Sequence, residues 1–234
     1  MSEEDHTTQM SRLAAGAYGN AHEHAAKTNY VVHPDASFSD HNMTTYHHRD
    51  DEKHIVVAHR GTAPGSKGGG RDIQNDLAFM AGRGGHEDRM HRRKNKTEQI
   101  LNKTGATTFH LTGHSLGGGS VNHTIANSSL VQDKLTTANT FNAAAHPFAS
   151  NSMSVSKKAS KRLRGKVTHN RTEYDAVSMG LKTNTPFGKV KTRKAKKASK
   201  ASFGSQVLTG LAGFTMGGVA KKSLDAHGIG NFHD

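Results

Sequence analysis

The chain has 234 residues, no cysteine and a formal net charge of +13 at pH 7. This length accommodates one domain with a substantial core, and the lack of cysteine excludes disulfide bonds and thiol chemistry. The sequence contains no run of about 18 apolar residues, so a membrane-spanning helix is not expected. The polar start MSEEDHTTQM lacks the basic and apolar regions of a secretion signal. We therefore expect a soluble or peripheral protein that attracts an anionic partner: lipid, nucleic acid or an acidic protein.

The first quarter of the chain predicts helices followed by a β-hairpin. Residues 8–27 are rich in alanine with polar residues between, which predicts one or two helices that cover a sheet. Residues 42–48 and 54–59 are β-prone and flank a short charged turn, as in a hairpin. The continuous apolar run at residues 55–57 predicts a buried central strand.

The most informative stretch is residues 106–127, with the sequence ATTFHLTGHSLGGGSVNHTIAN. A short apolar strand at residues 109–111 runs into Gly113, Ser115 and Gly117, and a helix follows. A serine flanked in this way at a strand-to-helix junction is typical of the nucleophile elbow of α/β-hydrolases, and the alternative is a plain glycine-rich turn. The helix N-terminus at this spot favours the oxyanion that forms when an ester is attacked. We therefore predict that Ser115 is a nucleophile.

Strands and helices alternate through the rest of the central region, which favours a parallel sheet. His123 lies eight positions past the serine on the same helix, and we expect it to be a surface residue. The expected elements are a charged loop at 82–93, a helix at 94–104, one helix continuing over 120–130, a strand at 135–143, a loop or solvated helix at 150–161, and a strand at 167–170.

Two motifs together resemble the class 3 lipase family, the fungal triacylglycerol lipase type. They are VAHRGT at residues 57–62 and GHSLGG at residues 113–118, with a histidine where the family has an aromatic residue before the arginine. The resemblance covers roughly residues 44–232. It implies an α/β-hydrolase fold, with a mostly parallel central sheet and helices on both faces, in a single domain over residues 1–234. It also implies that Thr62 supplies one oxyanion-hole donor, the backbone N–H of Leu116 being the second.

The same resemblance implies the other two members of a catalytic triad. Asp175 follows a strand in the family's Asp-x-Val pattern and would orient the histidine, with Glu173 as its nearest competitor. His227 and Phe232 match the family's closing His-x-x-x-x-aromatic pattern, so His227 would be the general base, and His233 is the runner-up. The order of serine, acid and histidine along the chain also fits an α/β-hydrolase.

The activity implied is that of a serine carboxylic-ester hydrolase acting on lipids, a triacylglycerol lipase or an enzyme of phospholipase A1 type. The same triad could run peptidase or acyltransferase chemistry, because the elbow does not define the leaving group. The alternative is a basic binding or structural protein on a lipase scaffold, for instance within a virus particle. We expect no cofactor and no metal, since the histidines lack ligand spacing and the triad needs none.

Residues 182–200, KTNTPFGKVKTRKAKKASK, form the strongest charge run in the chain. We expect a basic loop or insertion that either is simply solvated or attracts an anionic membrane surface. Phe187 is the lone aromatic residue there, so nucleic acid is the less favoured partner. Residues 203–220 are read as a helix or loop near the acyl pocket, with membrane contact as an alternative. Nothing in the sequence indicates an oligomeric state.

Overall fold

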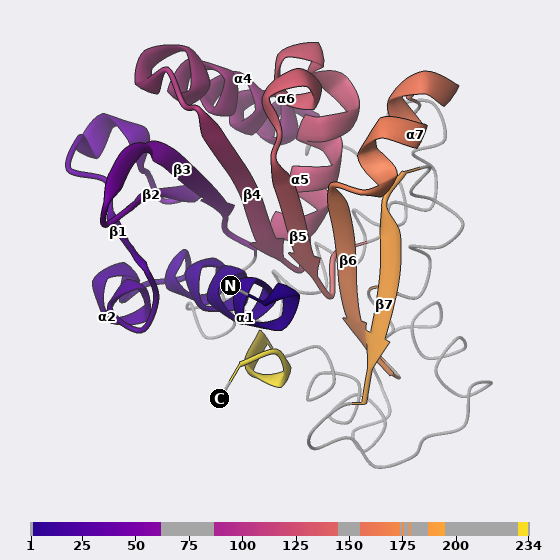
Figure 1. Ribbon diagram of the computed structural model, residues 1–234, viewed down its shortest axis with the longest axis horizontal. Helices are drawn as coiled ribbons and strands as arrows, with labels where there is room; N and C mark the ends of the chain where they lie inside the picture. The colour runs from indigo at the N-terminus through magenta and orange to yellow at the C-terminus, as the bar shows by residue number, and fades with distance from the viewer. Residues whose placement is uncertain are drawn as a thin grey trace.

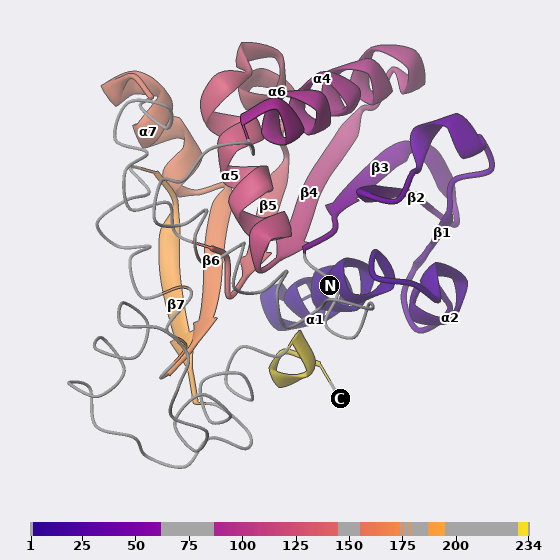
Figure 2. The same cartoon turned by 180° about the vertical axis from the view of Figure 1, so that it is seen from behind.

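A computed structural model of the chain describes residues 2–61, 87–144, 155–173, 175, 178, 187–194 and 229–233. These residues form a seven-stranded sheet whose strand order follows the sequence, from β1 to β7. The first three strands are antiparallel, and β3 to β7 run parallel to one another. Helices lie on both faces (Figures 1 and 2). The predicted α/β class with a mostly parallel sheet is therefore confirmed.

The N-terminal part covers one face and supplies the antiparallel strands. Its elements are α1 (Glu3–Gly16), α2 (Ala21–Ala26), β1 (Tyr30–Val32), the short helix η1 (Ala36–Phe38), β2 (Met43–His48) and β3 (Asp51–His59). Helix α1 begins where Ser2 and Asp5 cap each other reciprocally, through Ser2 Oγ at 3.1 Å from the Asp5 N–H and Asp5 Oδ2 at 3.4 Å from the Ser2 N–H. The predicted N-terminal helices and hairpin are confirmed, and β1 is an additional strand.

The remaining elements build the parallel part of the sheet and its second helical layer. They are α4 (Glu87–Thr104), β4 (Thr108–His114), α5 (Leu116–Asn127), α6 (Ser129–Lys134), β5 (Thr137–Phe141), α7 (Lys157–Arg164), β6 (Val167–Thr172), β7 (Lys189–Arg193) and the short helix η2 (Ile229–Asn231). In the part of the chain that the structure describes, no helix is both long and apolar enough to cross a membrane.

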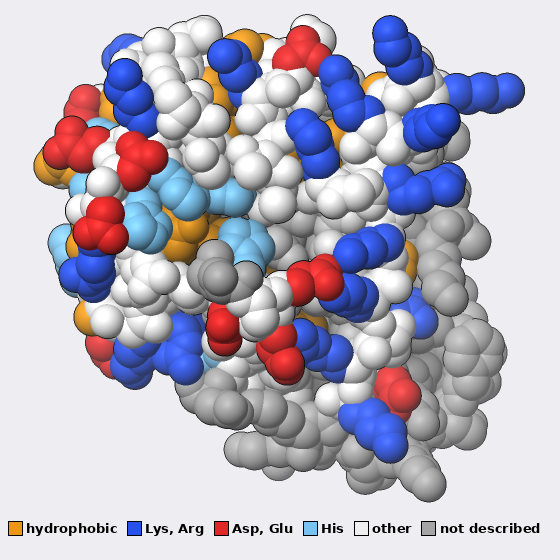
Figure 3. Space-filling model, in the orientation of Figure 1, with side chains coloured by type: hydrophobic (Ala, Val, Ile, Leu, Met, Phe, Trp, Pro, Cys, Tyr) orange, Lys and Arg blue, Asp and Glu red, His pale blue; other side chains and the backbone are white. Residues whose placement is uncertain are grey.

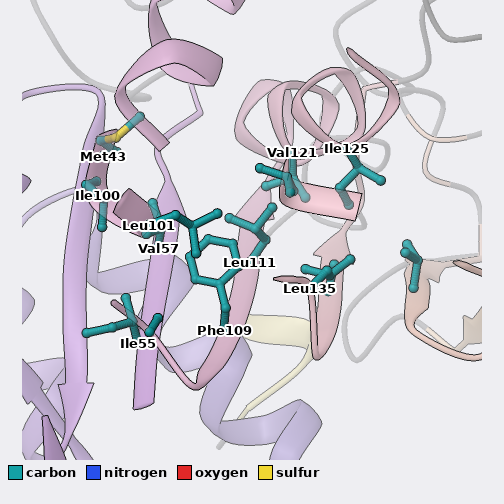
Figure 4. Packing of buried hydrophobic residues seen from close by; sticks show 14 of the residues in the cluster. Met43, Ile55, Val57, Ile100, Leu101, Phe109, Leu111, Val121, Ile125 and Leu135 are labelled. Atoms are coloured by element: carbon teal, nitrogen blue, oxygen red, sulfur yellow. The ribbon is translucent and has the colours of Figure 1, made fainter. Parts of the chain in front are cut away.

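Strand alternation divides the core between the two faces. On one face Ile55 and Val57 of β3 pack with Phe109 and Leu111 of β4 under α4 and α5 (Figure 4). On the other face Val56 of β3 packs with residues of α1 and with Phe232 near the chain end. Since side chains of a strand alternate between faces, a strand with no polar position in its centre must be covered on both sides.

Three local predictions are wrong. The expected loop at 82–93 is helical from Glu87 onward, because Met90, Arg93, Thr97, Ile100 and Leu101 form one buried face at helical spacing. The polar identity of Arg93 and Thr97 hides that periodicity in the sequence. The single helix expected over 120–130 is broken at Ser128, whose side chain accepts a hydrogen bond from the Val131 N–H and starts α6.

The third error concerns the basic run at 182–200. Its residues 189–193 are not a loop but β7, which pairs in parallel with β6 at the edge of the described sheet. The strand is hard to read from KVKTR because an edge strand exposes polar side chains on more than one side. Residues 179–186 and 195–200 lie outside the described residues, as do residues 203–220.

Several histidines are buried in this fold with their ring nitrogens in hydrogen bonds. His59 contacts Ser120 Oγ at 3.0 Å through Nδ1 and Thr97 Oγ1 at 3.1 Å through Nε2. His169 contacts Thr140 Oγ1 at 3.0 Å through Nδ1 and the Phe187 carbonyl at 3.0 Å through Nε2. Burial lowers the pKa of His59 to about 3 and that of His169 to about 4. Both imidazoles are therefore neutral in the folded protein at neutral pH.

We predict that acid destabilises the fold before its carboxylates titrate. The unfolded imidazoles bind protons below a pH of about 6.5, whereas His59, His169 and also His110, whose pKa burial lowers to about 3, stay neutral. The free energy of unfolding should therefore fall as the pH decreases from about 6.5, by up to about 1.4 kcal/mol per pH unit for each group. Urea denaturation at several pH values between 7 and 5 measures this slope, and a flat or rising stability over that window would contradict it.

Candidate active site

Ser115 occupies the turn between β4 and α5, at the carboxyl end of a parallel strand in the middle of the sheet. Its backbone has φ 56° and ψ −127°, a conformation that side-chain-bearing residues rarely adopt. Its N–H donates to the Phe141 carbonyl at 3.0 Å, and its carbonyl accepts from the Ala144 N–H at 2.9 Å. A serine at positive φ between a strand and a helix has the conformation typical of the nucleophile turn in α/β-hydrolases.

Two glycines make this turn possible. A Cβ on Gly113 would lie 2.6 Å from the carbonyl carbon and oxygen of Gly117, and a Cβ on Gly117 would collide with the backbone carbonyl of His59. The first turn of α5 therefore lies directly on the backbone of β4 and on the end of β3. Close approach of backbone to backbone is therefore the reason for glycine at both positions.

The end of β3 and the end of α1 lie beside the serine. A Cβ on Gly61 would lie 3.2 Å from the Ser115 Cβ and 2.6 Å from the His114 carbonyl oxygen, so the Arg60–Gly61 backbone borders the site. The Tyr18 hydroxyl is 2.8 Å from His114 Nδ1 and 3.3 Å from the His114 carbonyl oxygen. Tyr18 falls within residues 8–27, for which the sequence predicts only one or two helices. No local pattern connects it with His114, which lies far away in the sequence.

The carboxyl ends of β5 and β6 are joined to the elbow through Asn142. This residue follows β5 with a positive φ of 42°, which asparagine tolerates better than most residues. Its N–H donates to the Asn170 carbonyl at 2.8 Å, and its side-chain oxygen accepts from the Thr172 N–H at 2.8 Å. The last residues of β6 are thereby held beside the segment after β5 that is hydrogen-bonded to Ser115.

Asp175 lies three residues beyond β6, two strands away from the strand that carries Ser115. Only 1% of its surface is exposed, and its Oδ2 accepts a hydrogen bond from the Ser178 N–H at 3.1 Å. Its competitor Glu173 is half-buried, and the Glu173 N–H donates to the Arg193 carbonyl at 2.8 Å, which extends the pairing of β6 with β7. Burial at the carboxyl end of the sheet thus distinguishes Asp175 from Glu173.

The C-terminal segment packs against α1 and the end of β5. Phe232 is 2% exposed, and its ring lies 5.0 Å from that of Phe141, centroid to centroid. His233 Nδ1 lies 3.1 Å from Ser11 Oγ of α1, and its ring approaches His24 of α2. His227 lies outside the described residues, as does Thr62.

Leu116 is the first residue of α5, and its side chain is 1% exposed. As the first helical residue it has no carbonyl within the helix to which its N–H can donate. Among the described residues, no backbone hydrogen bond from this N–H is present. The group lies next to the serine and at the positive end of helix α5.

His123 is not the surface residue that we expected. It is 8% exposed on α5, with Nδ1 3.4 Å from the Asn127 side-chain amide and its ring 5.2 Å from that of His91 on α4. The helix that starts at the elbow is enclosed by α4, so its polar residues are buried as well. Within the described ranges, no group of three or more histidine and acidic residues is arranged to hold a metal ion.

Solved structures similar to this chain include fungal lipases. Lipase II from Rhizopus niveus shares 13% identity over 77% of this chain and 75% of its own, with a TM-score of 0.49. A lipase from Rhizopus microsporus var. chinensis shares 14% identity over 75% and 68%, with a TM-score of 0.44. A mutant form of MDLA from Penicillium cyclopium shares 15% identity over 86% and 84%, with a TM-score of 0.47.

No protein-family model matches the chain, and no curated protein matches it. The chain thus resembles fungal lipases among the solved structures.

We predict that Gly117→Ala destabilises the fold, because the added Cβ would overlap the His59 carbonyl, which the sheet holds in place. Forced overpacking of this kind costs about 1–3 kcal/mol. Gly165→Ala is the matched control, since Gly165 has φ −82° and a Cβ there would meet nothing within 4 Å. Urea denaturation of both variants tests the idea, and equal stability of the two would contradict it.

Proposed function

We propose that the protein is a serine carboxylic-ester hydrolase that acts on lipid esters. The observation that carries the proposal is the conformation of Ser115, with φ 56° and ψ −127°, at the end of β4 and the start of α5. Backbone strain of this size persists only where surrounding structure enforces it, and such residues cluster at active sites. Here the packing of α5 on the backbone of β3 and β4 holds Ser115 in this conformation, and Gly113 and Gly117 leave room for that packing.

The proposed reaction has two stages. His227 takes the proton of Ser115 Oγ as that oxygen attacks the ester carbonyl, and the N–H of Leu116, together with Thr62, stabilises the oxyanion. When the carbon–oxygen bond of the ester breaks, the alcohol leaves with the proton from His227. Water, deprotonated by the same histidine, then attacks the acyl carbonyl; the bond to Ser115 Oγ breaks, His227 returns the proton to that oxygen, and the carboxylic acid is released. Asp175 would accept the other imidazole N–H and stabilise the imidazolium.

Three features support these roles. Asp175 is buried just past the carboxyl end of β6, whose last residue, Thr172, donates its N–H to the Asn142 side chain. Only Gly228 separates His227 from Ile229, and Ile229 packs with the core cluster that contains Phe141. A lipid as substrate is supported by the RGT and GHSLGG motifs, which resemble those of class 3 lipases. Triacylglycerols and phospholipids cleaved in the A1 manner are the candidate substrates.

The deciding experiment is hydrolysis of short- and long-chain p-nitrophenyl esters by the wild type and by Ser115→Ala. We expect kcat/KM to fall by about 10⁴-fold or more, because the nucleophile is lost while the fold is kept. The control Ser129→Ala removes an exposed hydroxyl at the start of α6 and should leave the activity unchanged. A wild type that is folded but inactive, also on mixed lipid vesicles, would leave a binding protein on this scaffold as the alternative.

The acid and the base are assigned by paired variants. Asp175→Asn should lower kcat by about 10³- to 10⁴-fold, because the imidazole loses its orienting acceptor, whereas Glu173→Gln should change it little. His227→Gln should abolish turnover, and His233→Gln should not. Should Glu173 or His233 prove essential in place of its neighbour, the corresponding assignment would be wrong.

Tyr18 is expected to position the elbow through His114. Tyr18→Phe removes the hydroxyl that lies 2.8 Å from His114 Nδ1 and keeps the ring. We expect kcat to fall by about 10- to 100-fold with little change in KM, because small displacements of a nucleophile slow chemistry more than binding. Thermal melting serves as the control. A change in melting temperature with normal kcat would assign Tyr18 a purely structural role.

A further inference from the structure

The outer edge of the molecule at β7 carries a dense set of cations. We call it the basic edge, and define it by the lysines and arginines of residues 157–171 and 189–194. Its members are Lys157, Lys158, Lys161, Arg162, Arg164, Lys166, Arg171, Lys189, Lys191, Arg193 and Lys194. Figure 3 shows these blue side chains along the side of the molecule formed by α7 and β7. The two described segments, 155–173 and 187–194, contain a single acid, Glu173.

Helix α7 contributes a one-sided cationic surface. Leu163 is its buried residue, and the cations of α7 are exposed. At about 100° per residue, the five cations of α7 fall within an arc of roughly 160° that faces away from Leu163. The helix therefore lies on the sheet through one apolar residue and directs its charge outward.

Strand β7 adds cations at the sheet edge, on the face covered by α1 rather than on the face that carries α7. Lys189, Lys191 and Arg193 alternate along the strand and share one face. The single carboxylate of Glu3 lies 2.9 Å from Lys189 Nζ and 2.8 Å from Lys191 Nζ. These two ammonium groups lower the pKa of Glu3 to about 2. One carboxylate between two lysines leaves this part of the edge positively charged.

Among the described residues, most of the other cations of the basic edge form no ion pair. Arg162 pairs with Asp133 at 2.8 Å. In the described part of the chain, no ion pair is present for Lys157, Lys158, Lys161, Arg164, Arg193 or Lys194. By contrast, the cations of α4 include Lys94 and Lys96, which pair with Glu98 and Asp40. What distinguishes the edge is the number of cations beside a single acid, since Asp88 and Glu98 stand among the cations of α4.

We propose that the basic edge binds the phosphodiester backbone of double-stranded nucleic acid without reading its sequence. A duplex carries one phosphate charge per about 1.7 Å of its axis, and the five residues of β7 span about 17 Å, so the strand alone faces several phosphates. The two apolar groups that anchor the edge, Leu163 and Phe187, are 0% and 3% exposed. Without exposed aromatics the surface offers no base stacking, and phosphate contacts remain.

The position of the edge favours a linear polyanion over a membrane. Helix α7 leads through residues 165–166 into the start of β6, whereas Ser115 follows the end of β4. The cations of α7 therefore lie toward the amino ends of the parallel strands, and the elbow lies at their carboxyl ends. A bilayer docked on α7 would not face the serine. The edge also lacks exposed apolar residues of the kind that insert into an interface.

Lysines on an edge strand also prevent pairing with another chain, and this explains some of the charge on β7. It does not explain α7, whose backbone is satisfied within the helix. Edge protection therefore accounts for cations on β7 only, and substitution of the α7 cations tests polyanion binding separately.

The test is binding of a fluorescent 20-base-pair DNA duplex and of the matching RNA duplex by the full chain, followed by anisotropy over a salt series. The edge variant Lys158→Gln/Lys161→Gln/Arg164→Gln is compared with Lys53→Gln/Arg92→Gln/Lys103→Gln, which removes the same charge from exposed positions on β3 and α4. We expect the wild type to bind both duplexes with a salt slope of about −5. The edge variant should bind about 10- to 100-fold more weakly, and the magnitude of its salt slope should fall by about 2–3. The control variant should keep the affinity and the salt slope of the wild type.

Two unrelated duplex sequences should bind equally well, since phosphates carry no sequence information. Vesicles with phosphatidylserine form the parallel arm. No duplex binding by the wild type, equal losses in the edge and control variants, or edge-dependent binding to vesicles alone would each overturn the proposal. Hydrolysis of a water-soluble ester is read in the same samples, and we expect the edge variant to retain it.

Discussion

The structure depends on one close approach of backbone to backbone. The first turn of α5 rests on the last residues of β3 and β4, at a distance that leaves no room for a Cβ on Gly113 or Gly117. This contact sets the angle between strand and helix, and the positive φ of Ser115 follows from it. The helix N-terminus and the hydroxyl are thereby directed to the same place. A contact made through a flexible side chain could relax, and it would not hold the serine backbone in so unfavourable a conformation.

The sheet extends this constraint to the neighbouring strands. The Ser115 N–H donates to Phe141 at the end of β5, and the Ser115 carbonyl accepts from Ala144, which follows β5. Asn142 links this segment to β6. The carboxyl ends of three parallel strands therefore form one rigid unit, with Asp175 buried just beyond it. Rigid positioning of this kind is what acyl transfer requires of its catalytic groups, because most of the rate enhancement comes from preorganised geometry and charge.

Charge is distributed unevenly over the molecule. Histidines occupy buried or half-buried positions in the sheet, where desolvation keeps those such as His59, His110 and His169 neutral. Lysines and arginines instead accumulate on α7 and β7, at the edge of the described sheet. Hydrolysis at the elbow and polyanion binding at the basic edge would use different surfaces of one scaffold. The positive charge of α7 and β7 would then act on a partner and not on the reaction.

The sequence by itself determined the features that depend on neighbouring residues. The glycine spacing around Ser115, the apolar run of β3 and the alternation of strands and helices predicted the parallel sheet and the elbow, because each rests on the local backbone. The tertiary structure alone decided the contact of Tyr18 with His114 across 96 residues, the hydrogen bonds of Asn142 and the burial of His123. It also decided that a basic run contains the edge strand β7. Long-range contacts leave no periodic signal in the chain, since any residue with the right atoms can make them once the fold brings it close.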